Sequence, residues 1–573
     1  MALGTPVSWT ASVSGASPGT LAYRFRVRAT GGDFHTLVDY GPKTALTWTT
    51  IDQEGSYQVE VSVQNNNTGE VAAADAMQAF TPLVNGTAPV VSPSVNPFVF
   101  IYSAPACAPG ARMRVQFQSP GGFFQTTAYK PCLAGSSMNF YLAGMVPGAA
   151  YTIQHWIETG RAMEGGPSVP FTPASVTGVA SSPPFTLIGP DLPPQGLLLQ
   201  SLLGEASVAT DLQGNLVWTS PPDISFLTRA VSGGTFLGIF EDGTQGPAQQ
   251  FFREFDLAGI TVAETNAAQV SQQLAKLGIR PINGFHHEAR KLRGGGYLVL
   301  ADSERILTNV QAAGPVDVIG DTIVVLNQDL QVTWAWDTFD HLDTYRTATL
   351  GETCTYPAGL ACAPFYLSPT ANDWLHGNAL QLLPDGNILY SVRHQDWVVK
   401  IDYANGSGSG AILWRMGLAG DFRILSTDLS PWFSHQHDPN FEMNGTVMLV
   451  FDNGNVREAS NPSAHSRGQV LEVDERNLVV TTRLDADLGV YSVAAGSAQL
   501  LPDGNYNFDA AFLLSAASGG TLLTAAETFQ VEPTGTIDFG IHFGAFNYRT
   551  FRMPDLYTAP EDALPKPPPR PRP

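Results

Sequence analysis

Six of the chain's 11 histidines lie close to three glycine-containing turns in the second half of the sequence. A neutral imidazole can act near pH 7 as a nucleophile, as a general base or as a metal ligand. A group of histidines at related positions therefore indicates a site of chemistry. The six are His286, His287, His376, His394, His435 and His437.

Three of these histidines occupy nearly the same place relative to their turn. His287 and His437 each precede a turn glycine by eight residues, and His376 precedes one by ten. Equivalent positions on three structural repeats would bring the three imidazoles together. Such a trio also suits zinc or copper, but the acids Glu288 and Asp438 follow directly in sequence and would point to the other face of a strand.

An internal repeat predicts the elements that position these histidines. QLLPDGNILY (381–390) and QLLPDGNYNF (499–508) are nearly identical, and weaker copies cover 229–240, 291–300 and 441–450. A second repeat, a strand ending in an acid before a turn, recurs at gaps of 45, 73, 73, 72 and 58 residues, at Asp211, Asp256, Asp329, Asp402, Asp474 and Glu532. Six such hairpins predict a six-bladed β-propeller over residues 195–555, with the histidines at the start of its innermost strands.

The first third of the chain predicts two further modules. Short alternating segments separated by Gly, Pro and Asn turns indicate an immunoglobulin-like β-sandwich over 1–90 and a fibronectin type III-like one over 91–180. Residues 176–195 are Pro-rich and predict a linker, and 556–573 predict a Pro-rich tail. Only 14% of residues are charged and 43% are hydrophobic, so the whole chain is expected to be all-β.

The charge and the hydropathy exclude some partners. A net charge of −21 argues against nucleic acid, which needs a basic face. The sequence contains no apolar run of the length that spans a membrane, and its N-terminus lacks the pattern of a signal peptide. The oligomeric state stays open, a homodimer included.

The four cysteines form two local pairs, Cys107 with Cys132 and Cys354 with Cys362. Neither pair has the CxxC spacing of a metal site, so two disulfides and an oxidising compartment are expected, with four buried thiols as the alternative. A periplasmic or secreted location follows, with any signal peptide lying outside the given sequence.

Three stretches resemble the bacterial PAPS-independent arylsulfate sulfotransferase family: FHHEARKL, NDWLHGNALQLLPDGNILYSVRHQDWVVKID and QHDPNFEMNGTVMLVFDNGN. The resemblance covers about residues 195–550. It implies a six-bladed propeller that moves a sulfuryl group from an aryl sulfate donor to a phenolic acceptor, with no cofactor. The two N-terminal modules depart from the family, in which one is usual.

The resemblance also assigns roles to residues. It implies His437 as the nucleophile that forms a sulfohistidine in a ping-pong reaction, His287 and His376 as supporting substrate-binding histidines, and Arg393 as the sulfuryl-binding arginine. His286 could replace His287, and His435 could be mistaken for His437. Asp438 or a backbone carbonyl is expected to hold the tautomer of the nucleophile.

Two other features bear on function. The short loop between Cys354 and Cys362 is similar to a disulfide loop near the family's active site. The chain has no phosphate-binding GxxxxGK[ST] motif, in agreement with a donor other than a nucleotide. A metal-dependent propeller hydrolase or lactonase and a non-catalytic binding propeller are the alternative functions.

Overall fold

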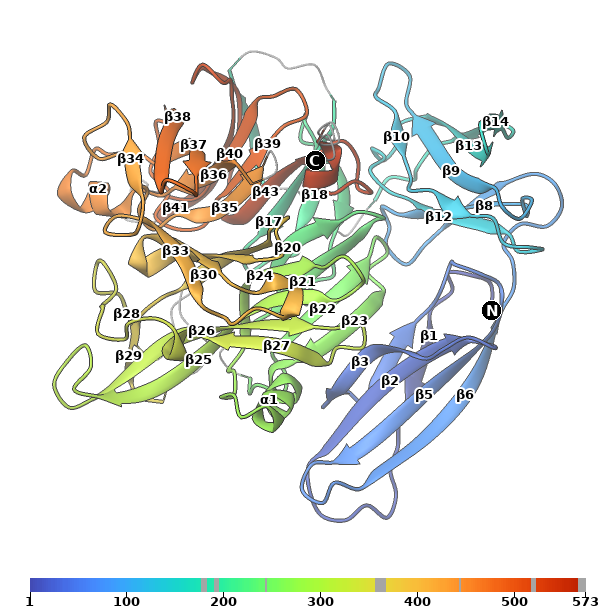
Figure 1. The fold of residues 1–573 in the computed structure, drawn as a ribbon. Helices are drawn as coiled ribbons and strands as arrows, with labels where there is room; N and C mark the ends of the chain where they lie inside the picture. Colours follow the sequence, from blue (N-terminus) through green and yellow to red (C-terminus); the bar gives the residue numbers. More distant parts are fainter. Residues whose placement is uncertain are drawn as a thin grey trace.

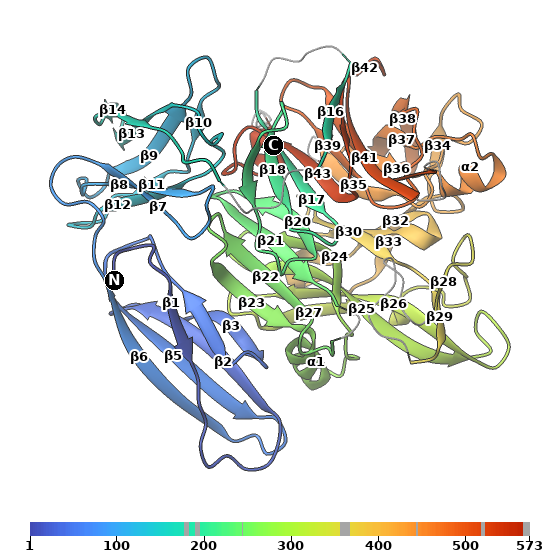
Figure 2. The same ribbon diagram turned by 180° about the vertical axis from the view of Figure 1, so that it is seen from behind.

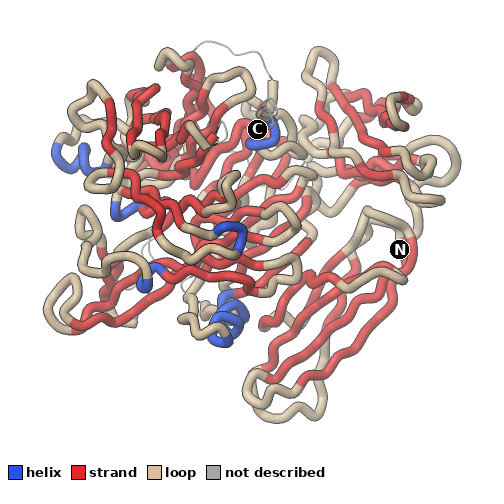
Figure 3. The backbone as a smooth tube through the Cα atoms, viewed as in Figure 1, coloured by secondary structure: helices blue, strands red, loops and turns tan. Residues whose placement is uncertain are grey.

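The computed structural model describes residues 1–176, 183–189, 195–242, 245–355, 367–442, 445–516 and 522–564. The fold is all-β, as predicted, with many small antiparallel sheets and few short helices (Figures 1 and 3). The predicted alternation of buried and exposed residues is clear in β2 (Leu21–Ala29), where Phe25 and Val27 enter the core.

The N-terminal residues form two sheets that pack on one core. β1 (Val7–Thr10) pairs with β4 (Ala45–Trp48), and the other sheet has the order β3 (His35–Gly41), β2, β5 (Gly55–Asn65), β6 (Val71–Phe80). Their core holds Trp48, Tyr57 and Phe80. β3 also pairs in parallel with β23 (Thr261–Asn266), so this sheet continues into the later part of the chain.

The next residues form another pair of sheets, which lies beside the first in both ribbon views (Figures 1 and 2). One has the order β12 (Met138–Leu142), β8 (Phe100–Ala104), β7 (Val90–Pro93). The other has β9 (Arg112–Gln118) and β13 (Tyr151–Thr159) at its centre, and its remaining strands are β10 (Gln125–Thr126), β11 (Lys130–Pro131), β14 (Ala162–Gly165) and β15 (Val169–Phe171). The predicted Cys107–Cys132 disulfide is confirmed.

Within the described residues, the rest of the chain contains six four-stranded antiparallel meanders. Their strands are β20–β23 (Phe226–Val231, Thr235–Phe240, Phe251–Asp256, Thr261–Asn266); β24–β27 (Phe285–Lys291, Tyr297–Thr308, Pro315–Leu326, Val332–Asp337); β30–β33 (Gly377–Leu382, Ile388–Val392, Trp397–Ile401, Ile412–Gly417); β35–β38 (His437–Glu442, Val447–Asp452, Arg467–Asp474, Val479–Asp487); β39–β42 (Ser497–Leu500, Tyr506–Ala516, Leu522–Val531, Ile537–Phe543); and β43 (Asn547–Met553) with β17–β19 (Leu197–Leu202, Val208–Asp211, Leu216–Thr219).

The last meander joins the two ends of this region. β43 pairs antiparallel with β17, and Leu199 lies opposite Phe551. The first strands of successive meanders pack against each other in the order β20, β24, β30, β35, β39, β43, and β17 packs back on β20. The acids of the predicted repeat stand at or just after the third strand of each meander, for example Asp256 at the end of β22 and Asp474 at the end of β37.

Several short strands and helices are added to the meanders or lie in the connections between their strands. β28 (Thr353–Thr355) and β29 (Thr370–Asp373) extend the second one, β34 (Arg423–Leu425) extends the fourth, and helices α1 (Ala267–Lys276) and α2 (Asn455–Ser460) lie in connections. None of the described helices has the length and apolar character needed to cross a membrane.

Two predicted boundaries need correction. The segment expected to be only a linker contains β16 (Phe185–Ile188), which pairs with β42 at the edge of the fifth meander. The chain also stays packed beyond residue 556, where the tail was expected to begin, because Leu556 and Tyr557 are buried and helix α3 (Pro560–Ala563) follows. Residues 565–573 and Cys362 lie outside the described residues, so the predicted pairing of Cys354 with Cys362 stays a prediction.

The strand pair that joins the two ends of the meander region is expected to control stability. Leu199→Ala removes a fully buried side chain from β17 and should lower the free energy of unfolding by about 2–5 kcal/mol. Urea unfolding followed by tryptophan fluorescence measures this. Leu429→Ala, at a fully exposed leucine, is the matched control and should change little. Equal effects of the two variants would contradict this role for the β17–β43 pair.

Asp509 in β40 predicts a pH-dependent stability. Burial raises its pKa to about 8, although the Thr550 hydroxyl opposes the shift. Between the ordinary pKa near 4 and pH 8 the folded chain therefore keeps a proton that the unfolded chain releases, so stability falls as pH rises through this range. Asp509→Asn should raise the melting temperature at pH 8 clearly more than at pH 4. The exposed Asp33→Asn control should show no such difference.

Candidate active site

The six histidines singled out in the sequence gather at one end of the first strands of three consecutive meanders. His286 and His287 lie near the start of β24, His376 precedes β30, and His437 begins β35. His394 lies in the 3-10 turn η2 (Arg393–Gln395) after β31. The rings form a row, with centroid distances of 5.0, 4.8, 4.7 and 5.5 Å along His286, His287, His376, His394 and His435.

The backbone is irregular where these strands begin. His287, His376 and Asp438 have positive φ angles of 56°, 51° and 49°, and the pairing register shifts at the start of β24, β30 and β35. Such bulges redirect side chains, and a left-handed non-glycine residue costs roughly 1–3 kcal/mol. The same irregularity on three meanders is a feature typical of functional sites.

His437 is held as a single tautomer. Its Nδ1 lies 2.7 Å from Oδ1 of Asn453, while the backbone N–H of Ala495 donates to Nε2 at 3.1 Å. The Asn453 amide cannot turn over, because its Nδ2 donates to the carbonyls of Ser492 and Ala495. The proton of His437 is therefore on Nδ1, and the lone pair is on Nε2.

The surroundings keep His437 neutral. Burial lowers its pKa well below the usual value, and the positive charge of Arg393 adds to this effect. His437 is 2% exposed. At neutral pH its Nε2 therefore carries a lone pair, which accepts the Ala495 N–H, rather than a proton.

His287 is neutral with the opposite tautomer. Burial and the neighbouring His376 lower its pKa well below the usual value. His286 differs, because Asp302 and Asp321 overcome its burial and raise its pKa to about 9. The protonated His286 thus donates from Nδ1 to Nδ1 of His287, at 2.8 Å. The proton of His287 is left on Nε2, where it can be donated.

His394 and His376 are oriented by one acid. The Nδ1 of His376 lies 2.8 Å from a carboxylate oxygen of Asp373, and Nδ1 of His394 donates to the Asp373 carbonyl at 2.7 Å. Nε2 of His394 accepts from a guanidinium N–H of Arg393, whose Nη2 donates to the Val493 carbonyl at 3.2 Å. Nε of Arg393 is buried and has no partner among the described residues.

His435 is a poorer nucleophile than His437. Its Nδ1 lies 2.9 Å from Asp396, and its Nε2 is hydrogen-bonded to Glu352. These carboxylates overcome burial and raise its pKa, so both nitrogens are committed. The prediction that Asp438 holds the tautomer of His437 is wrong. The Asp438 carboxylate binds Arg229, and Asn453 is the hydrogen-bond partner of His437 Nδ1.

The sequence reasoning missed three residues of this region. Asn453 belongs to the quoted FDNG stretch, but nothing marked it as the partner of the histidine. Tyr548 and Arg549 come from β43, where no histidine or turn pattern draws attention. The Tyr548 ring lies 5.5 Å from that of His287, and Tyr548 Oη donates to the Asn378 carbonyl at 3.2 Å.

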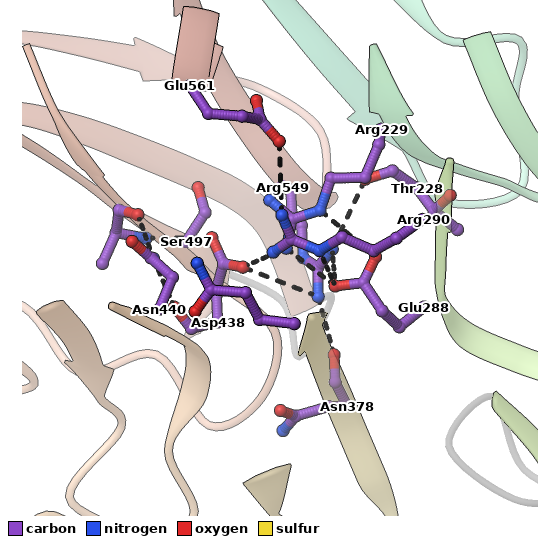
Figure 4. A network of polar contacts seen from close by, with 12 residues as sticks. Thr228, Arg229, Glu288, Arg290, Asn378, Asp438, Asn440, Ser497, Arg549 and Glu561 are labelled. Carbon is purple, nitrogen blue, oxygen red and sulfur yellow. Dashed lines mark hydrogen bonds and ion pairs between the residues drawn. The ribbon is translucent and has the colours of Figure 1, made fainter. Parts of the chain in front are cut away.

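A buried ion network lies deeper along the first strands (Figure 4). Glu288 accepts from Arg229 at 2.7 Å and from Arg549 at 2.9 Å, and Arg229 also binds Asp438. Burial alone would raise the pKa of Glu288, but the two arginines outweigh it and lower the pKa to about 2. Arg549 Nη2 donates to the Asn378 carbonyl at 2.6 Å, so the network reaches five of the meanders.

Some side chains of the site could also hold a metal. Three described groups bring donor atoms within 4.8 Å of one another: Glu352, His394 and His435; Asp373, His376 and His394; and His286, Asp302 and Asp321. Imidazole and carboxylate are suitable donors for zinc. His437 belongs to none of these three groups.

Fold and site together define an all-β protein with a buried histidine and arginine site. The chain belongs to the arylsulfotransferase (ASST) family, whose model matches residues 196–549. None of the curated proteins matches the sequence. Among solved structures, a DUF4784 family protein from Bacteroides caccae matches with 8% identity and a TM-score of 0.18, over 77% of this chain and 80% of the other. Family membership supports a sulfotransferase with donor and acceptor substrates.

The state of His437 can be measured directly. In protein labelled with ¹⁵N-histidine, the resonances absent from His437→Gln identify the ring. At pH 6.5 they should show a neutral imidazole protonated at Nδ1, because burial and Arg393 disfavour the imidazolium. A charged ring, or a proton on Nε2, would contradict the hydrogen bonds from which the tautomer follows.

Proposed function

We propose that the chain is a PAPS-independent aryl sulfotransferase that transfers a sulfuryl group from an aryl sulfate to a phenol through a sulfohistidine on His437. The observation that carries this proposal is the neutral His437, whose Nε2 lone pair is kept free of a proton by Asn453 and Ala495. Membership of the arylsulfotransferase family supplies the reaction class.

In the first half-reaction, the Nε2 lone pair attacks sulfur as the bond from sulfur to the aryl oxygen breaks. The electron pair of that bond leaves on the aryl oxide. The Nδ1–H of His437 keeps donating to Oδ1 of Asn453, and this hydrogen bond stabilises the positive charge of the substituted ring. In the second half-reaction a phenol oxygen attacks sulfur, the sulfur–Nε2 bond breaks, and the phenol proton passes to a base.

The neighbours suit the charges that develop. His287 has a proton on Nε2 to give to the leaving aryl oxide, and it can recover one from the incoming phenol. Arg393 supplies a fixed positive charge near His437 for the sulfuryl oxygens. The Ala495 N–H, which loses its acceptor when Nε2 is substituted, can turn to a sulfuryl oxygen. The ring of His376 lies between those of His287 and His394, and His394 is hydrogen-bonded to Arg393. His376 therefore joins His287 and Arg393 around the proposed sulfuryl position.

We further propose that the six meanders are the blades of a β-propeller over about 195–555, with the histidines at one mouth of its axis. The packing of the first strands in sequence and the β17–β43 pairing support this.

Residues 1–90 and 91–180 are proposed as separate β-sandwich domains. The Cys107–Cys132 disulfide supports a periplasmic or secreted location.

A metal-dependent hydrolase is the alternative favoured by a specific observation, the three donor groups around His394, His376 and His286. The two functions differ in what they need. A hydrolase would lose activity on treatment with a chelator and would not depend on a phenolic acceptor. Sulfuryl transfer through His437 requires no metal and should be accelerated by phenol.

The proposed reaction is tested with p-nitrophenyl sulfate, with and without phenol. Wild-type protein should release nitrophenol in a phenol-dependent way. His437→Gln should reduce the rate by roughly 10⁴-fold or more, because the nucleophile is lost. The matched control, His465→Gln, changes a half-exposed histidine outside the site and should keep full activity.

Further measurements separate the alternatives. Without phenol, wild-type protein should gain the mass of one SO₃ group on the peptide containing His437, and His437→Gln should not. Phenol-independent release that disappears after chelation would replace the transferase with a metal-dependent hydrolase. Full activity of His437→Gln would overturn the assigned nucleophile.

A further inference from the structure

A cavity lies at the opposite end of the first strands from the histidines. Its volume is about 820 Å³. The histidines stand where β24, β30 and β35 begin, whereas this cavity is lined where β30, β35 and β39 end, by Leu382, Phe441, Glu442 and Leu500. It is therefore distinct from the site of the proposed transfer reaction.

The buried ion network separates the two places. Arg229 and Asp438 line the cavity, and both connect to the network of Glu288 and Arg549 (Figure 4). Arg549 is fully buried, and Glu288 is too. A molecule in the cavity would thus rest on a layer of paired charges and would not reach the histidine row.

Arg290 provides an incompletely satisfied cation in the cavity wall. Its Nη1 donates to Glu561 of α3 at 3.2 Å. Its Nε and Nη2 are buried and have no hydrogen-bond partner among the described residues, and Nε is 3.8 Å from Glu288. Only 14% of the side chain is exposed, so water has little access to replace a partner. A buried guanidinium with unused donors favours an oxyanion.

The other charged residues leave this preference intact. Arg229 is already paired with Glu288 and Asp438. Arg293 is exposed and makes no side-chain hydrogen bond or ion pair within the described part of the chain. Glu442 lies in the wall, but burial raises its pKa to about 7, so much of it is uncharged near neutral pH. Within the described lining, Arg290 is therefore the buried cation that keeps unused donors.

The acid that contacts Arg290 comes from a short segment near the end of the described chain. Glu561 is half-exposed and belongs to the four-residue helix α3 near the end of the described chain. Its neighbour Asp562 accepts a hydrogen bond from the Ser232 hydroxyl at 2.6 Å. The carboxylate of Glu561 thus occupies one donor of Arg290 from within the chain, as a ligand carboxylate would.

Apart from Gln381, Asn440 and Gln499, the remaining wall is largely apolar and partly aromatic. Phe441, Leu500, Tyr506 and Phe551 line it, with Leu382 and Pro384 beside them. A cavity of this size with apolar walls and a few convergent polar groups is typical of small-molecule sites. The apolar surface suits a hydrocarbon or aromatic body attached to the anionic group.

We infer that this cavity is a second ligand site, which binds an aromatic carboxylate with its carboxylate on Arg290 and its ring against Phe441, Leu500 and Tyr506. Glu561 competes with the ligand for the guanidinium. Binding at this cavity does not depend on the proposed transferase activity, so the two can be tested separately.

The test uses the full chain and 2-naphthoate as probe, with neutral 2-naphthamide beside it, in ligand-observed NMR titrations. In the cavity, naphthoate should bind clearly more tightly than the amide. Arg290→Gln should weaken naphthoate binding roughly tenfold or more, since hydrogen bonds to charged groups are lost. Glu561→Gln should tighten it, because the competing carboxylate disappears.

Two controls make the outcome decisive. Asp562→Asn removes the neighbouring acid of the same cavity, which does not contact Arg290, and should change the affinity much less than Glu561→Gln does. His437→Gln should also leave it unchanged, which separates this site from the histidine site. Loss of naphthoate binding in His437→Gln, an affinity equal for acid and amide, or no tightening in Glu561→Gln would each overturn the inference.

Discussion

The pairing of buried charges along the first strands is the constraint on which the rest of the structure depends. Glu288 comes from β24, Arg229 from β20, Asp438 from β35 and Arg549 from β43, and each is almost completely buried. An unpaired charge at such depth would cost several kcal/mol, so these strands are stable only when they meet. Once they meet, their beginnings and their ends are each brought together, which creates the histidine row at one end and the cavity at the other.

The clustered histidines of the site show how the surroundings give one residue type two different charge states. His287, His394 and His437 are buried beside positive charges, and their pKa values lie well below the usual range. His286 and His435 are equally enclosed but face carboxylates, and their pKa values are raised. Neutral imidazoles able to act as nucleophile or proton carrier thus lie close to charged ones, and the charged His286 orients the neutral His287.

Much of the meander arrangement and of the histidine cluster could be predicted, because both depend on local sequence patterns. The glycine turns and the acids after each third strand mark the meanders, since each turn type needs particular residues at fixed positions. The spacing of His287, His376 and His437 from those turns marked them as neighbours. β16 escaped prediction, because its four residues become a strand only by pairing with β42, more than 300 residues later in the chain.

The sequence by itself determined that the chain is all-β, which histidines belong together, and that Cys107 and Cys132 lie close. These follow from short-range periodicity and from repeat register, which the chain carries locally. Only the tertiary structure decided the tautomers of His287 and His437, the replacement of Asp438 by Asn453, and the entry of Arg549 and Tyr548. Protonation and partner choice depend on burial and on charges from distant strands, which no local pattern records.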